Sequence, residues 1–170
     1  MLITDRTQYH VDLLNNLRKK TWAEMSASER ELWNTEASKG AYNYTDLNRV
    51  EMAVGKIAEL FNYPWGDYPI KTDWTPWDIP KKTDMERYLD NLQRLIDWSN
   101  WSYQQYPERY PQGLSYIPRI PQTMENLTYQ GANNIEKALE VICKRHSIDL
   151  GNNSAVLGTA VLGTMVLGGE

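Results

Sequence analysis

With 170 residues, the chain is long enough for one ordinary domain with an apolar core and a short appendage. Its 18 Lys and Arg against 22 Asp and Glu leave a net charge of −4, so the positive charge expected of a nucleic-acid-coating protein is missing. Because Cys143 is the only cysteine, an internal disulfide is excluded and a zinc site would lack its usual thiolate ligands. The first residues lack the features of a secretory signal, so synthesis and assembly in the cytoplasm are expected.

Apolar residues at helical spacing predict two helices in the first part of the chain. The first is expected at about residues 6–20, where Val11, Leu14 and Leu17 share a face. The second is short and begins at a capping-box pattern, in which Ser26 and Glu29 each satisfy a free amide at the helix start.

Three further helices follow, and their starts are predicted from residues whose side chains can cap a helix. In the third, the apolar stripe runs from Leu47 to Phe61, with Thr45 or Asp46 as the cap. In the fourth, a capping box of Thr83 and Glu86 precedes a stripe that runs from Met85 to Ile96. The fifth is expected after Thr128, with Ile135, Ala138, Leu139 and Ile142 on one face.

Parts of these helices resemble one another in sequence. Residues 45–50, Thr-Asp-Leu-Asn-Arg-Val, are similar to residues 83–88, Thr-Asp-Met-Glu-Arg-Tyr, and a weaker likeness is seen in residues 132–136, Ala-Asn-Asn-Ile-Glu. The spacings between the copies differ, so a regular solenoid with a fixed period is not indicated. Repeated use of one capped-helix solution is the interpretation.

All eight prolines fall between Pro64 and Pro80 or between Pro107 and Pro121, where they exclude helix interiors. Two extended, ordered arms are therefore expected at residues 63–82 and 103–123. The two arms, and the residues just before the second arm, are rich in aromatic rings. Ordering an arm costs conformational entropy, and burial of these rings can offset that cost. Five tryptophans form the predicted aromatic contact surface: Trp65, Trp74, Trp77, Trp98 and Trp101.

The last segment, residues 151–170, contains a Val-Leu-Gly unit three times. With a glycine in every unit, it is too short and too interrupted for a membrane span, which needs about 20 apolar residues. Valine-rich units broken by glycine suit short strands, so the segment is predicted to dock on another chain's sheet edge. The residues expected to dock are Val156, Leu157, Val161, Leu162, Val166 and Leu167.

Candidates for catalysis are weak, and no enzyme, cofactor or metal site is predicted. The nearest carboxylate pairs, Asp73 with Asp78 and Glu86 with Asp90, are more simply explained as caps and helix-dipole partners. Cys143 lies three residues before His146 on a predicted helix, but a lone cysteine beside an apolar residue is usually a small buried filler.

The pattern Trp74-x-x-Trp77, flanked by two aspartates, leaves two interpretations open. The rings and carboxylates could form a platform on which a sugar stacks. Alternatively, the rings pack on the protein's own helices, because a proline-rich arm needs apolar contacts to stay ordered. The second interpretation is favoured.

Three segments carry a resemblance to a known group of proteins: residues 40–54, which include Asp-Leu-Asn-Arg-Val-Glu; residues 71–89, which include Trp-Thr-Pro-Trp-Asp-Ile-Pro; and residues 124–139. Together they resemble a module of tail, baseplate and fibre-associated proteins of phages and prophages of Gram-positive bacteria, over roughly residues 4–146. The resemblance implies a structural role in a virion assembled in the bacterial cytoplasm, and it brings no catalytic residue with it. It leaves the position open among the tail, the baseplate, the fibre attachment and the collar.

The expected architecture is mainly α: a small helical bundle with long proline- and aromatic-rich connections and a short extended or β C-terminal tail. Residues 1–150 would form the helical domain and residues 151–170 the docking tail. The expected function is assembly with other virion structural proteins, in multiple copies, without nucleic acid or membrane. The alternative is a module that recognises a host cell-wall glycan through exposed Trp and Tyr.

Overall fold

The computed structural model describes residues 1–61 and 69–150, and across these ranges the chain is mainly helical, as predicted. No β-strand is found in these ranges. The docking tail and Trp65 lie outside the described residues. The elements are α1 (Gln8–Leu17), α2 (Ala27–Thr35), the 3₁₀ helix η1 (Ala37–Gly40), α3 (Tyr44–Leu60), α4 (Lys82–Gln105), the 3₁₀ helix η2 (Pro107–Arg109) and α5 (Tyr129–Arg145).

Two of the predicted helix starts are confirmed. At α2, the Glu29 amide donates to Ser26 Oγ at 3.2 Å, and the Ser26 amide donates to Glu29 Oε2 at 2.9 Å, which completes the capping box. At α5, Thr128 Oγ1 accepts from the Gly131 amide at 3.1 Å. The sequence alone was sufficient here because the cap and its partner lie within one turn of each other.

The predicted caps of α3 and α4 are wrong, and the reason is the same for both. Helix α3 begins at Tyr44, because Asn43 is the cap and Asp46 Oδ2 accepts from the Asn43 amide at 2.8 Å. Helix α4 begins at Lys82, and Asp84 Oδ2 accepts from the Lys81 amide at 2.9 Å. In both helices the cap lies before the predicted one, and an aspartate three residues after the cap accepts from the cap's amide: Asp46, predicted as a possible cap itself, in α3, and Asp84, in place of the predicted Glu86, in α4.

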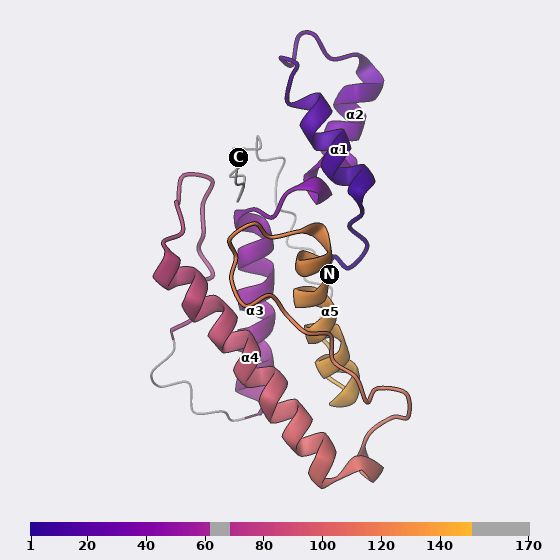
Figure 1. Cartoon of the computed structure of the whole chain (residues 1–170), viewed down its shortest axis with the longest axis vertical. Helices are drawn as coiled ribbons and strands as arrows, with labels where there is room; N and C mark the ends of the chain where they lie inside the picture. Colours follow the sequence, from indigo (N-terminus) through magenta and orange to yellow (C-terminus); the bar gives the residue numbers. More distant parts are fainter. Residues whose placement is uncertain (62–68, 151–170) are drawn as a thin grey trace.

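The body of the molecule consists of α3, α4 and α5 around one apolar core. Figure 1 shows α3 between the start of α4 and the start of α5, with the long α4 crossing α3 obliquely. Side chains at helical spacing on all three helices are buried there, and they include Val50, Ile57, Leu92, Leu95, Ile135 and Leu139. Burial of one apolar stripe per helix is what holds such a bundle together.

The N-terminal part forms a second, smaller unit with its own apolar cluster. Helices α1 and α2 and η1 pack around Leu14, Leu17, Met25 and Ala37. In Figure 1 this N-terminal unit lies beyond the ends of α3 and α5. The helices are therefore divided between two clusters within residues 1–150.

The N-terminal unit depends on a close approach between η1 and α1 at Gly40. A Cβ at this position would overlap the carbonyl group of His10 and press on the Leu14 side chain. We expect Gly40→Ala to lower the free energy of unfolding by about 1–3 kcal/mol, as overpacking does. Gly55→Ala inside α3 is the control, because only the end of the Ile70 side chain is close, at 3.2 Å, and alanine favours a helix. Urea unfolding of both variants measures the difference, and equal stabilities would contradict this packing.

The second predicted arm, residues 103–123, is only partly extended. Helix α4 continues to Gln105, and η2 follows directly. The connection is then held to the body mainly by aliphatic side chains, since Ile117, Ile120 and Met124 are buried in the core, whereas Tyr116 is exposed. The prediction that aromatic rings order this arm is therefore correct only in part.

Candidate functional site

The structure separates the five predicted contact tryptophans. Trp77 is 88% exposed and Trp101 is 55% exposed, as a contact surface requires. Trp98 is half-buried and stacks on Phe61, with ring centroids 4.0 Å apart. Trp74 is only 5% exposed and belongs to the core, where its Nε1 donates to Glu51 Oε1 at 3.2 Å. Trp74 is therefore not part of a contact surface, and it does not form a sugar platform with Trp77.

Trp77 and Ile79 project from a turn whose backbone is fixed by hydrogen bonds. The Asp78 amide donates to the Thr75 carbonyl at 3.1 Å, and the Thr75 amide donates to the Asp78 carboxylate at 2.7 Å. The Trp77 amide donates to Thr75 Oγ1 at 3.3 Å. Ile79 is 82% exposed, so two large apolar side chains face solvent from one ordered segment, here called the Trp77 turn (residues 75–79).

The residues just before this turn are held to α3 by side chains that bond to their backbone. Asn48 donates to the Trp74 carbonyl and accepts from the Trp74 amide, each at 2.8 Å. One turn further along α3, Glu51 accepts from the Lys71 amide at 2.8 Å. This arrangement, the arm clamp, fixes an extended segment without a partner strand, and it sets the position of the Trp77 turn.

The same arrangement recurs between α5 and the N-terminus. Asn133 donates to the Arg6 carbonyl at 2.8 Å and accepts from the Arg6 amide at 3.1 Å. Glu136, three residues later, accepts from the Ile3 amide at 2.6 Å. This N-terminal clamp and the arm clamp share an Asn-x-x-Glu pair on a helix and an extended x-Thr-Asp-x segment, residues 3–6 in one and 71–74 in the other.

An arginine from a neighbouring helix completes each clamp. Arg87 of α4 binds Glu51 through both terminal nitrogens, each at 2.7 Å. Arg49 of α3 binds Glu136 through Nε at 2.9 Å and Nη2 at 2.7 Å. Two-point pairing of this kind fixes the helices relative to each other, because both hydrogen bonds depend on the plane of the guanidinium.

Asp46 and Arg6 add a second charge pair to the N-terminal clamp. Arg6 Nη2 lies 2.7 Å from Asp46 and 2.8 Å from Glu136, and Arg49 also contacts Asp46. The two carboxylates raise the pKa of Arg6 against the opposing effect of burial. Two cations and two anions thus balance in the interior. The Asp-Leu-Asn-Arg-Val-Glu phrase therefore places its four polar residues in the two clamps.

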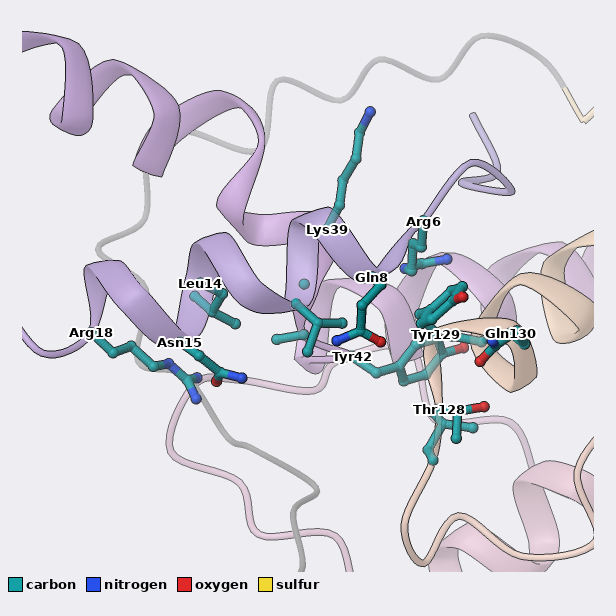
Figure 2. Close-up of a pocket in the computed structure, with 15 residues that line it drawn as sticks. Arg6, Gln8, Leu14, Asn15, Arg18, Lys39, Tyr42, Thr128, Tyr129 and Gln130 are labelled. Carbon is teal, nitrogen blue, oxygen red and sulfur yellow. The ribbon is translucent and has the colours of Figure 1, made fainter.

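A crevice of about 420 Å³ lies where the N-terminal unit meets the body. Figure 2 shows its two sides: Leu14 and Asn15 of α1 with Arg18 at its C-terminal cap, and Tyr129 and Gln130 of α5 with Thr128 at its N-terminal cap. Arg18 Nε and Nη2 are buried without a hydrogen-bond partner, and burial lowers the pKa of this arginine. Crevices between two structural units are common places for a ligand or partner to bind.

Cys143 and His146 do not have the properties of a nucleophile and its base. Cys143 is buried, and burial raises the pKa of its thiol to about 11, so the thiolate is scarce at neutral pH. Burial lowers the pKa of His146 to about 4, and its Nε2 lies 3.2 Å from Ser99 Oγ, between aromatic rings. The prediction that Cys143 is buried filler is confirmed.

Three of the four carboxylates singled out in the sequence, Asp73, Asp78 and Glu86, have structural partners. Asp78 braces the Trp77 turn, and Asp73 Oδ1 accepts from Lys71 Nζ at 2.8 Å. Glu86 lies near Lys82 on the exposed side of α4. Among residues 1–61 and 69–150, no group of three or more His, Cys, Asp or Glu side chains is placed to hold a metal ion. Nor does that part of the chain contain a helix both long and apolar enough to cross a membrane.

Comparison with known proteins adds no relative: no protein-family model matches the chain, and neither a curated protein nor a solved structure is found to be similar. The fold and the site therefore define a mainly α protein with two helix-borne clamps, one projecting apolar turn and one basic crevice. Its function has to be argued from these features.

Proposed function

We propose that this chain is a structural subunit of a phage or phage-tail-like particle, in the tail, baseplate or fibre-attachment region, and that it acts by protein–protein assembly. The resemblance of residues 4–146 to phage tail, baseplate and fibre-associated proteins supports the assignment to such a particle. The Trp77 turn supports the mode of action, because two large apolar side chains are kept in solvent by a segment that is fixed in place.

The rigidity of the turn is what distinguishes it from an ordinary exposed side chain. Tryptophan is over-represented among the residues that contribute most to protein interfaces. A contact residue that is already ordered before binding loses less conformational entropy when the partner arrives. The arm clamp and the hydrogen bond between the Thr75 amide and Asp78 supply that order. The conformational entropy of the turn is therefore lost during folding and not during assembly.

The experiment is incorporation into particles. We expect the double variant Trp77→Ala, Ile79→Ala to fold normally and to be depleted in purified particles by about tenfold, which corresponds to about 1.4 kcal/mol of binding free energy. Quantitative mass spectrometry of particles from cells that produce the variant measures this. Met52→Ala, a half-exposed apolar residue on α3 outside the turn, is the control and should be incorporated normally.

Two outcomes would contradict the proposal. If the chain is absent from purified particles altogether, it is not a structural subunit. If the protein instead binds cell-wall polysaccharide saturably in a fluorescence titration, and Trp77→Ala abolishes this binding, glycan recognition is the function.

A further inference from the structure

The crevice between the N-terminal unit and the body carries positive charge that its own lining does not neutralise. Arg6, Arg18 and Lys39 line it, whereas no Asp or Glu is found among its lining residues in the described part of the chain. Arg6 is engaged by Asp46 and Glu136, and Lys39 Nζ binds Asp5 at 2.8 Å. Arg18 has two buried nitrogens, Nε and Nη2, without an acceptor, and Arg6 Nε is also buried without one.

Buried nitrogens of this kind indicate that an acceptor is supplied from outside. Nearly all buried polar groups in native proteins are hydrogen-bonded, and a guanidinium has donors but no acceptor of its own. The rest of the lining is mixed, with Leu14 and the rings of Tyr42 and Tyr129 beside the amide side chains of Asn15 and Gln130. The crevice therefore suits a segment that combines an apolar side chain with a carboxylate.

The Trp77 turn has this combination. Asp78 lies between its apolar residues, Trp77 and Ile79, and Asp73 lies two residues before the turn. Lys71 lowers the pKa of Asp73, and the Thr75 amide lowers the pKa of Asp78, so both carboxylates are ionised at neutral pH. Asp78 gives one oxygen to the Thr75 amide, and the other oxygen can still accept from a guanidinium.

The turn and the crevice of one molecule lie on different sides of α3. In Figure 1 the segment that leads into α4 lies on one side of α3, and the start of α5 and α1 lie on the other. We infer that the basic crevice receives the Trp77 turn of a second copy of this chain. Such an interface is heterologous, so copies join head to tail and form a ring or a filament according to the rotation between them.

This inference rests on the proposed function and names the partner of the Trp77 turn within the particle. Its test uses the full chain in sedimentation velocity over a range of concentrations. The wild-type protein is expected to associate as concentration rises. Trp77→Ala and Arg18→Glu are each expected to weaken association by at least about tenfold. Arg18→Ala is a second crevice variant, in case the reversed charge disturbs the end of α1.

Mixing the two variants gives the sharper result. Trp77→Ala keeps an intact crevice and Arg18→Glu keeps an intact turn, so a one-to-one mixture should form heterodimers that grow no further. Lys19→Glu, an exposed charge reversal next to Arg18 but outside the crevice lining, and Trp101→Ala should associate as the wild type does. Circular dichroism and melting curves verify that all variants are folded.

Two results overturn the inference: a wild-type protein that stays monomeric at every concentration, or two folded variants that fail to complement each other. Either result leaves particle incorporation intact if the proposed function is correct, because the turn would then contact a different subunit. Absence from particles contradicts the proposed function instead, so the two failures are distinguishable.

Discussion

Replacing Glu136 with alanine is expected to lower the free energy of unfolding by about 3–5 kcal/mol, the range found when one partner is removed from a buried ion pair. The Glu136 side chain is 0% exposed, and its two oxygens accept from Arg6, Arg49 and the Ile3 amide. Without it, two guanidinium groups share Asp46 as their only carboxylate, with the Arg6 side chain buried and the Arg49 side chain only 19% exposed. The loss follows mainly from this uncompensated charge. Urea unfolding, followed by circular dichroism, is the measurement.

Glu140→Ala is the matched control for this prediction. Glu140 lies one turn further along α5, and its pair with Lys144, at 2.6 Å, is on the protein surface. Pairs of this kind contribute only about 0.3–0.5 kcal/mol. A loss below about 1 kcal/mol for Glu136→Ala would mean that the cluster is hydrated or rearranges, and it would contradict a buried clamp as described.

The helices were largely predictable from sequence, because each signal involves residues within a turn or two of one another. The apolar stripes from Leu47 to Phe61 and from Met85 to Ile96 identified α3 and α4 correctly. Their starts were misplaced because Asp46 and Asp84 were not considered as the residues that reach back to the amide of the cap. Helix ends are decided by single hydrogen bonds, and several neighbouring side chains can compete for them.

The two clamps could not be predicted, although their signal is visible in the sequence. The likeness between residues 45–50, 83–88 and 132–136 was interpreted as a repeated helix start. The structure shows that part of it marks a shared tertiary device: Asn48 with Glu51, and Asn133 with Glu136, each hold a distant x-Thr-Asp-x segment. Which segment each pair holds depends on contacts across 20 to 133 positions of the chain, and no local pattern specifies such pairs.

The aromatic surface was predicted only in part for a related reason. Trp74 and Trp77 stand three residues apart in one proline-rich segment, and composition cannot decide which ring faces the core. Asn48 decides it, because its two hydrogen bonds to the Trp74 backbone hold this residue against α3. The turn that follows then carries Trp77 away from the body. The clamped residue Trp74 and the exposed residue Trp77 thus belong to one continuous segment.

The two tryptophans of this segment should therefore respond in opposite ways to the same substitution. Trp74→Ala is expected to cost about 3–5 kcal/mol of stability, since it removes a ring from the core and leaves a cavity. It also removes the donor to Glu51 Oε1, although Arg87 and the Lys71 amide still bind this carboxylate. Trp77→Ala should change stability by no more than about 0.5 kcal/mol, as is usual at exposed positions.

Urea unfolding of the two variants under identical conditions measures this contrast, and tryptophan emission supports it. Loss of the buried Trp74 should remove a blue-shifted contribution to the emission of the folded protein, whereas loss of the exposed Trp77 should remove a red-shifted one. Equal stability losses in the two variants would show that Trp77 is also packed on the body. The Trp77 turn would then not be an available contact surface, and the assembly proposal would lose the feature on which it depends.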